Sequence, residues 1–368
     1  MTSKRILLVI GGNTRAFREV GGYGRDKPRL PAAYTFLGAL SEAGFDVTLR
    51  GGLRLADFVG ILREASSRDE YDGILFHGSV GAWCALIGAA LSWDLSRFAF
   101  LSYTNRPGEG GRPGGRLKDA LYGIGAPRAD RVFFMTQEQA ATAARGTWGR
   151  PIRAVAIPLG VDTQFFRPRA GDEESIVVPG ARRGRRYVVV AGDQLRDEPR
   201  VEAILSGLGV DLVRLTMSRE VEAYWQERQR SDGLGFSVSC RVLLPFVEVA
   251  AIYRHAACVL NPVLNTWQPA GWTVTTEGMA SGVPVVTAAG LVTRELGTYL
   301  DRGQSLPLTV VEGLSVGAYR AALERVLSDD FDAVEAGAAA RAFAEEHLAI
   351  DRTGRLAAAA MERWLADR

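Results

Sequence analysis

The loop after the first apolar run, Ile6–Ile10, combines glycines with basic side chains. Gly21 and Gly22 stand ahead of a predicted helix, and Arg25 and Lys27 follow in the same segment. Glycine lets the backbone approach a ligand closely, and the N–H groups at the start of a helix bind phosphate. The loop therefore predicts a site for a diphosphate or an acidic acceptor, although a flexible surface loop would have the same composition. A dehydrogenase-type dinucleotide site is disfavoured, because no Gly-x-Gly-x-x-Gly directly follows the strand.

His77 is the second residue whose position suggests chemistry. It comes directly after the apolar segment 72–76 and before the small residues Gly78 and Ser79, which leave room for a ligand. A histidine that ends a parallel strand can hydrogen-bond a hydroxyl or a carbonyl group. By itself this position fits a structural histidine as well as a functional one.

The segment 104–116, after a predicted strand that ends at Tyr103, is rich in glycine, proline and arginine. At the carboxyl edge of a sheet such a loop can cover or recognise a ligand. Tyr103, Asn105 and Arg106 are therefore candidates for acceptor binding, and plain disorder of the loop is the alternative.

The composition excludes several other kinds of site. The three cysteines, Cys84, Cys240 and Cys258, form no Cys-x-x-Cys pair, and the three histidines have no metal-ligand spacing. We expect buried, reduced thiols, no structural zinc and a cytoplasmic protein. No segment approaches the ~20 apolar residues of a membrane span. The net charge of +2 gives no case for binding nucleic acid or a membrane surface.

The elements that must position these residues are short apolar runs that alternate with helical patterns. Continuous apolar strands between helices indicate a parallel sheet covered on both faces. The expected strands are residues 5–10, 46–50, 72–76, 98–103, 131–135, 153–157, 187–191, 211–216, 237–243, 258–261, 283–287 and 306–310.

The two series of strands are separated by a segment of proline, glycine and charged residues, which is typical of a linker. We expect an N-terminal domain over 1–168, a linker over 169–186 and a second domain over 187–345. A C-terminal helix over 346–368 is expected to return to the first domain. Each domain is then a doubly wound α/β unit of Rossmann type, and ligands bind outside the carboxyl ends of the strands, in the cleft between the domains.

The segment Ile157–Pro168 is the most specific motif of the first half. Its Ile-Pro-Leu-Gly-Val-Asp, followed by Phe and Pro, resembles the Ile-Pro-Asn-Gly-Val-Asp signature of glycosyltransferase family four, with Leu159 in place of Asn. These are retaining enzymes of GT-B architecture that use nucleotide sugars. The resemblance implies that this segment lines the cleft where the chain crosses into the second domain.

Other segments extend the resemblance along almost the whole chain. Gly21 and Gly22 match the glycine loop of the family, and Asp72–His77 is similar to its Asp-x-x-His-x-His, with His77 on the second histidine. That match implies contact between His77 and the donor sugar. The segment Thr276–Val286 resembles the nucleotide motif, which implies that Glu277 accepts hydrogen bonds from the ribose hydroxyls. One carboxylate can accept from both vicinal hydroxyls.

The chain also departs from the family pattern at two places. The first glutamate of the family's paired motif is replaced by Pro269, and Gln268 is the nearest polar residue. The arginine expected after the first strand of the second domain is replaced by Asp193, with Arg196 and Arg200 a turn later. Because a departing diphosphate needs cationic or N–H stabilisation, we expect these two arginines to supply it.

Together these features predict a retaining glycosyltransferase that moves a sugar from a nucleoside-diphosphate sugar to a hydroxyl-bearing acceptor, without a metal or other cofactor. The partners expected are the donor and the acceptor; no specific nucleic acid is predicted, and the sequence leaves the oligomeric state open. The predicted catalytic residues are His77, Arg196 and Arg200; the donor-binding residues Glu277, Gly21, Gly22, Gln268, Gly271, Trp272 and Thr276; the acceptor-binding residues Lys27, Tyr103, Asn105 and Arg106.

Three alternatives stay open from the sequence. The same scaffold serves nucleotide-sugar epimerases and sugar-phosphate phosphorylases. Pro269 and Asp193 would also fit a non-catalytic protein that binds a sugar nucleotide. A polymeric or nucleic-acid acceptor reached through the arginine-rich loops is the third.

Overall fold

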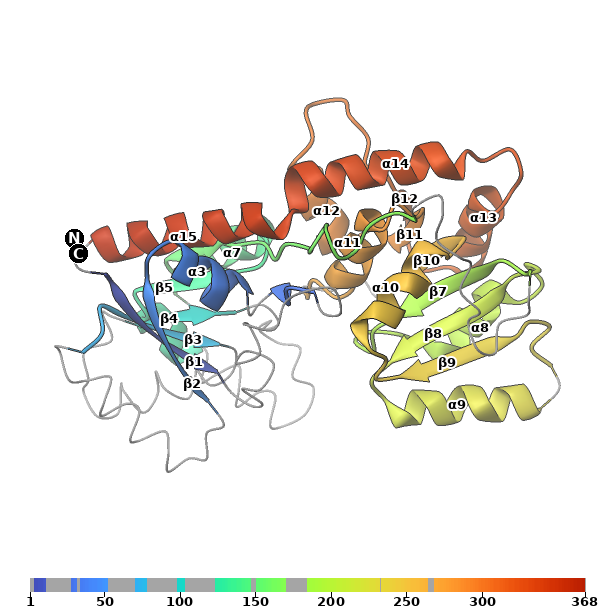
Figure 1. Ribbon diagram of the computed structural model, residues 1–368, viewed down its shortest axis with the longest axis horizontal. Helices are drawn as coiled ribbons and strands as arrows, with labels where there is room; N and C mark the ends of the chain where they lie inside the picture. The colour runs from blue at the N-terminus through green and yellow to red at the C-terminus, as the bar shows by residue number, and fades with distance from the viewer. Residues whose placement is uncertain are drawn as a thin grey trace.

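The computed structural model describes residues 3–10, 28–31, 34–51, 70–77, 98–102, 123–146, 150–169, 184–231, 233–263 and 268–367. These residues form two lobes, each built on a six-stranded parallel sheet (Figure 1). The doubly wound α/β fold predicted from the alternating strands and helices is confirmed.

The N-terminal sheet has the order β2-β1-β3-β4-β5-β6. Its strands are apolar on both faces: Leu7 and Val9 of the first strand pack in one cluster, and Ile6 and Leu8 pack in another. Such runs are expected where helices cover both faces of a parallel sheet. The strands are β1 (Arg5–Ile10), β2 (Asp46–Gly51), β3 (Gly73–His77), β4 (Phe98–Leu101), β5 (Arg131–Phe134) and β6 (Ala154–Ala156).

The C-terminal sheet has the order β12-β11-β10-β7-β8-β9. The chain runs outward from the centre in one direction and then in the other, so the strand order reverses between two central strands, β7 and β10. In an open sheet of this kind ligands bind at that switch point. The strands are β7 (Tyr187–Ala191), β8 (Asp211–Thr216), β9 (Val238–Val242), β10 (Cys258–Asn261), β11 (Val285–Ala288) and β12 (Thr309–Val311).

Short polar side chains start many of the helices. Thr136, Asp197, Ser218, Ser315 and Asp332 each accept a hydrogen bond from a backbone N–H in the first turn of the helix they precede, which satisfies donors that the helix itself cannot. The α-helices are α3 (Ala39–Glu42), α7 (Gln137–Ala144), α8 (Glu198–Leu205), α9 (Arg219–Arg230), α10 (Phe246–Arg254), α11 (Trp272–Ala280), α12 (Leu291–Gly297), α13 (Val316–Val326), α14 (Ala333–Phe343) and α15 (Ile350–Ala366). The described residues also include two π-helices, η2 (Tyr34–Gly38) and η4 (Ala344–Leu348), and a 3-10 helix, η3 (Ala126–Arg128).

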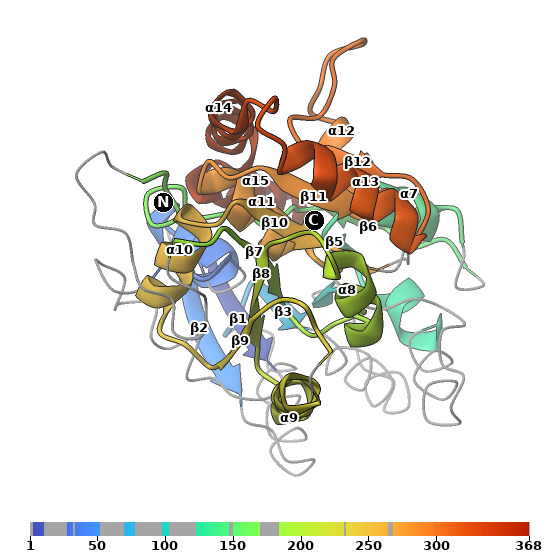
Figure 2. The same ribbon diagram turned by 90° about the vertical axis from the view of Figure 1, so that its right-hand side faces the viewer.

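The C-terminal helix α15 packs against η2 and α3 of the N-terminal lobe, whereas α9 and α14 lie at opposite ends of the C-terminal lobe (Figures 1 and 2). The indole of Trp364, near the end of α15, donates to Asp130 Oδ2 at 2.8 Å. The chain crosses between the lobes twice, and the two crossings meet in a parallel bridge between Val161 and Ala349.

No helix in the described part of the chain is long and apolar enough to cross a membrane.

Candidate active site

Two cavities lie at the carboxyl ends of the strands. The first, about 270 Å³, lies between the lobes: His77 and Leu101 line it from the N-terminal sheet, and the segment Gln268–Thr273 lines it from the C-terminal lobe. The second, about 370 Å³, belongs to the C-terminal lobe, and Glu277 is part of its lining. Thr273 lines both cavities, so the two spaces adjoin at the start of α11.

The start of α11 presents backbone donors at this junction. Gly271 precedes the helix in the left-handed conformation, with φ of 82°, and no side chain caps the first turn. The first N–H groups of an α-helix have no acceptor within the helix, and they carry a partial positive charge. Trp272 N already donates to Pro269 O at 3.1 Å. In the described part of the chain the donors left for an anion in this first turn are therefore the N–H groups of Thr273, which is exposed and lines both cavities, and of Val274.

Glu277 lies one turn further along α11, in the second cavity. Tyr253, a buried residue of α10, donates its hydroxyl to the carboxylate. Burial raises the pKa of Glu277 to about 8, and the hydrogen bond from Tyr253 offsets part of that rise. In the described part of the chain the carboxylate thus has Tyr253 as a donor, and it lines a cavity, which suits recognition of hydroxyl groups.

Apolar side chains surround the mouth of the second cavity. Met217 is 74% exposed and Leu243 is 70% exposed, and both line this space together with Phe246. Leu243 has φ of 54°, in the left-handed region. A large apolar side chain held open to solvent at a cavity mouth is a feature of ligand binding.

Arg196 stands in the loop after β7 and lines neither cavity itself; of the residues near it in this loop, Gln194 lines the first cavity and Gly192 lines the second. Its guanidinium donates to Ala191 O at 2.9 Å, Gln194 O at 2.8 Å and Asn261 Oδ1 at 2.7 Å. Burial, together with the nearby charge of Arg214, lowers the pKa of Arg196 to about 10. All three hydrogen-bond acceptors are neutral, so the described residues that bond this cation carry no opposite charge.

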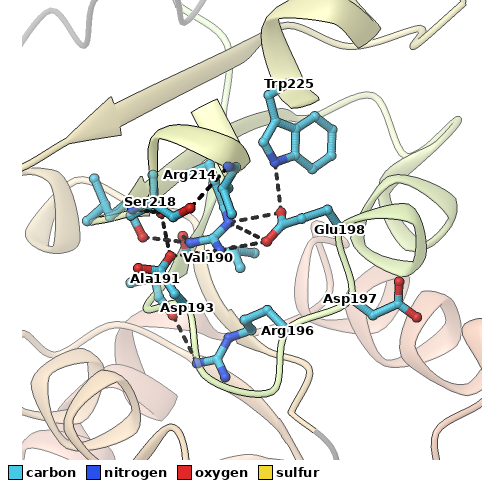
Figure 3. Close-up of polar contacts among 12 residues, drawn as sticks. Val190, Ala191, Asp193, Arg196, Asp197, Glu198, Arg214, Ser218 and Trp225 are labelled. Atoms are coloured by element: carbon cyan, nitrogen blue, oxygen red, sulfur yellow. Dashed lines mark hydrogen bonds and ion pairs between the residues drawn. The ribbon is translucent and has the colours of Figure 1, made fainter. Parts of the chain in front are cut away.

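Asp193, which replaces the expected arginine, belongs to a different cluster (Figure 3). Its carboxylate accepts from Thr216 Oγ1, from Met217 N at 2.9 Å and from Arg214 Nη2 at 3.4 Å. Arg214 is fully buried and also bonds both carboxylate oxygens of Glu198, at 2.7 to 3.2 Å. Trp225 Nε1 donates to the same carboxylate at 2.7 Å. Asp193 therefore fixes the loop after β7 to the end of β8.

The other predicted site residues fall into three groups. His77, at the end of β3, lines the first cavity, and burial lowers its pKa. Gln268, Gly271 and Trp272 line the same cavity, and the Trp272 indole donates to Leu159 O at 2.9 Å across the lobes.

Arg200 and Thr276 line neither of the two cavities. Arg200 lies on α8, where its Nε is 3.8 Å from Asp197 Oδ2. Thr276 is buried and donates to Thr273 O at 3.1 Å, a contact within its own helix. Both assignments remain predictions. Six further candidates lie outside the described residues: Gly21, Gly22, Lys27, Tyr103, Asn105 and Arg106.

Sequence reasoning missed Tyr253, Asn261 and Arg214. The only sequence signal for the last two is a polar residue within or at the end of an apolar strand, 211–216 or 258–261. Such a residue needs a partner when it is buried. Which partner it finds depends on contacts between residues far apart in the chain, as with Asn261 and Arg196.

The whole chain is similar to solved structures of carbohydrate-active proteins. Sucrose-phosphate synthase from Thermosynechococcus elongatus superposes with a TM-score of 0.74 at 15% identity, over 99% of this chain and 100% of the other. The catalytic domain of starch synthase IV from Arabidopsis thaliana, bound to ADP and acarbose, gives a TM-score of 0.66 at 12% identity, over 99% and 100% of the two chains. A protein from Listeria monocytogenes described as a UDP-N-acetylglucosamine 2-epimerase gives 0.58 at 14% identity, over 100% and 98%.

At these identities the similarity establishes the fold and not the activity. No family model matches the sequence, and no curated protein sequence matches it, so membership of glycosyltransferase family four stays a prediction. The chain has the GT-B architecture, in which two Rossmann-like domains face each other across a cleft.

Proposed function

We propose that this protein is a glycosyltransferase that moves a sugar from a nucleoside-diphosphate sugar to an acceptor hydroxyl. The observation that carries the proposal is the adjoining pair of cavities at the start of α11, with Glu277 in one and His77 in the other. A nucleoside fits the second cavity, with its ribose hydroxyls on Glu277 and its base among Met217, Leu243 and Phe246. The sugar then enters the first cavity.

The diphosphate of such a donor would lie where the cavities adjoin. There it meets the N–H groups of α11 and the charge of Arg196, which supply the stabilisation that a departing diphosphate needs. These groups make a divalent cation unnecessary in the proposed reaction. Chelation with EDTA should therefore leave the rate unchanged, whereas a large loss of activity that Mg²⁺ or Mn²⁺ restores would contradict this part of the proposal.

We further propose retention of the anomeric configuration. The described residues that line the first cavity include no carboxylate to act as a nucleophile. In a front-face reaction the acceptor oxygen attacks from the side of the leaving diphosphate, whose oxygen takes the acceptor proton, while His77 contacts the sugar. Closure of the two domains would exclude water. The N-terminal lobe would bind the acceptor, with Lys27, Tyr103, Asn105 and Arg106 as candidates.

Thermal unfolding in the presence of UDP, GDP, ADP and dTDP, and of their sugars, tests the proposal. A ligand at about 100 times its Kd stabilises the folded state by about 2.7 kcal/mol, so one of these nucleotides should raise Tm. Glu277→Gln should abolish that rise, and the matched change Glu324→Gln, on α13 and remote from the cavity lining, should preserve it. If none of the nucleotides raises Tm, the proposed function is wrong.

The fold similarity to an epimerase-like protein makes epimerisation the second candidate. Incubation of the donor that binds without any acceptor separates the two: an epimerase converts the sugar of the nucleotide, and a transferase releases nucleoside diphosphate slowly by hydrolysis. With an acceptor present, NMR of the product gives the anomer. An inverted anomer would exclude the retaining mechanism. Binding without turnover over a full panel of donors and acceptors would indicate a non-catalytic protein.

A further inference from the structure

Asn261 ends β10 at the switch point of the C-terminal sheet, beside β7. It is fully buried at the end of an otherwise apolar strand. A buried amide is costly unless its donors and acceptor are bonded, and this one is bonded at both ends. Its Oδ1 accepts from Arg196, and its Nδ2 donates to Thr275 Oγ1 at 2.9 Å, Thr287 Oγ1 at 3.1 Å and Gly271 O at 3.3 Å.

The same amide fixes the start of α11. A Cβ added at Gly271 would lie 2.2 Å from Asn261 Nδ2 and 2.4 Å from Oδ1, far inside van der Waals contact. Two features therefore require glycine at this position: the close approach of Asn261 and the positive φ of the residue. Thr275, the other partner of Nδ2 on α11, ties the first turn of the helix to the same point.

Arg196 lies next to the lining of the second cavity. A Cβ added at Gly192, which lines that cavity, would lie 3.7 Å from Arg196 Nη2 and 3.7 Å from Val274 Cγ2. Gly192 therefore lies between the guanidinium and the first turn of α11, within van der Waals reach of both. Arg196 Nε is buried and has no hydrogen-bond partner in the described part of the chain.

The charge of the partner matters as much as its position. A carboxylate in place of the Asn261 amide would form an ion pair with Arg196 and would repel an anion. The neutral amide orients the guanidinium and leaves its charge uncompensated. Burial of a cation without a counter-charge is unfavourable, and an anionic ligand bound beside Gly192 would relieve it.

We infer that Asn261 is a positioning residue for a diphosphate: its amide holds Arg196 and the start of α11 as one preformed anion site, and its neutrality keeps the arginine charge for the ligand. The inference rests on the proposed function, because it names how the donor diphosphate is bound.

Asn261→Asp tests the role of charge with almost no change of shape. The nucleoside diphosphate that binds best among UDP, GDP, ADP and dTDP is titrated by calorimetry, together with its nucleoside. Loss of one charge-assisted contact corresponds to about a 10- to 100-fold weaker affinity for the diphosphate, and the nucleoside should bind as before. Asn261→Ser, which removes the contact without adding charge, serves as a second variant and should give a smaller loss in the same direction.

Two further variants separate positioning from a structural role. Thr287→Val removes a partner of the Asn261 amide on the side away from Arg196, so it should lower stability but leave the ratio of the two affinities unchanged. In an Arg196→Gln background, Asn261→Asp should have little further effect on diphosphate affinity, because coupled residues are not additive. Equal weakening of nucleoside and diphosphate, or full additivity with Arg196→Gln, would overturn the inference.

Inorganic pyrophosphate distinguishes failure of this inference from failure of the proposed function. If no nucleotide binds, the proposed function is wrong, and protection of the protein by pyrophosphate against thermal unfolding then decides the role of Asn261. Protection that Asn261→Asp weakens supports the anion site. Protection that is absent in the unaltered protein, or is unchanged in the variant, overturns it.

Discussion

Arg214 lies within β8 and Arg196 lies in the loop after the neighbouring strand β7, and their surroundings differ in charge (Figure 3). Arg214 is fully buried and bonds two carboxylates, Glu198 and Asp193. Arg196 bonds two backbone carbonyls and the amide of Asn261. The first cation is compensated within the protein and holds structure together. The second is oriented by neutral acceptors, and it lies beside Gly192, which lines the second cavity.

This difference distinguishes a charge that stabilises the fold from a charge that is available to bind a ligand. Removal of a compensated charge leaves its partners buried and unpaired, so the cost appears in the stability of the fold. Removal of an uncompensated charge relieves an unfavourable burial, so the cost appears in binding instead. The two arginines are therefore expected to respond in opposite ways to the same kind of substitution.

The largest effect is expected from breaking the compensated cluster. Glu198→Gln removes the main counter-charge of Arg214 and should destabilise the fold by about 3–5 kcal/mol, because it leaves a buried guanidinium without its carboxylate. Urea denaturation measures the change. Glu222→Gln is the matched control: Glu222 pairs with Arg219, whose side chain is 76% exposed, and loss of that pair should cost under about 1 kcal/mol. Equal effects of the two substitutions would refute the structural role of the cluster.

Gly271→Ala tests the backbone conformation and the close packing at the start of α11, and it changes no charge. A left-handed alanine costs about 1–2 kcal/mol and overpacking costs about 1–3 kcal/mol more, so the loss of stability should be about 2–5 kcal/mol, measured by thermal or urea unfolding. Gly297→Ala offers the comparison, since Gly297 is helical and nothing lies near its missing Cβ. That change should be neutral or slightly stabilising. A well-tolerated Gly271→Ala would mean that the Asn261 contact is not as close as described.

Arg196→Gln tests whether Arg196, unlike Arg214, contributes to ligand binding rather than to stability. Affinity for the nucleoside diphosphate should fall by about 10- to 100-fold, since a charged hydrogen bond is worth about 1.5–3 kcal/mol. The stability of the unliganded protein should be unchanged or higher. Calorimetric titration and urea unfolding of the same sample give both numbers. A variant that is less stable but binds as before would assign Arg196 to structure, like Arg214.

The effect of Glu277 on stability depends on pH. Burial raises its pKa from the ordinary 4.5 to about 8 in the folded protein. A raised folded-state pKa means that protons bind more tightly when the protein is folded, so the stability that the neutral form contributes is present below pH 4.5 and is lost as pH rises through 8. Tm of the unaltered protein should fall over this window relative to Glu277→Gln.

Nucleotide binding should change in the opposite direction, because the proposed ribose contact uses the ionised carboxylate. Affinity for the diphosphate should rise as pH approaches 8, and Glu277→Gln should bind weakly at every pH. Parallel pH profiles of Tm for the two proteins would show that Glu277 does not titrate in this range.

Much of the fold could be predicted from the sequence. Each of the twelve expected strands has a counterpart among the described strands, because continuous apolar runs between helices leave few other arrangements. Strand ends shifted by one to a few residues: the run 306–310 became β12 at Thr309–Val311, and 98–103 became β4 at Phe98–Leu101. Hydrophobic patterns locate a strand better than they locate its last hydrogen bond.

The site could be predicted only in part. Glu277 and His77 could be predicted because both belong to local sequence motifs, and each lines one of the two cavities. Thr276, beside Glu277, turns its hydroxyl to its own helix instead. The partners that decide the electrostatics lie far along the chain: Arg196 is 65 residues from Asn261, and Arg214 is 16 residues from Glu198. Spacing along the chain does not show such pairings; the order of strands in the sheet creates them.

A crystal structure with the best-binding nucleoside diphosphate tests the proposed nucleotide site. We expect the ribose hydroxyls on the Glu277 carboxylate and the diphosphate between Arg196 and the first turn of α11. A nucleotide bound elsewhere, or one in this cavity whose phosphates leave Arg196 with only its present three acceptors, would contradict it.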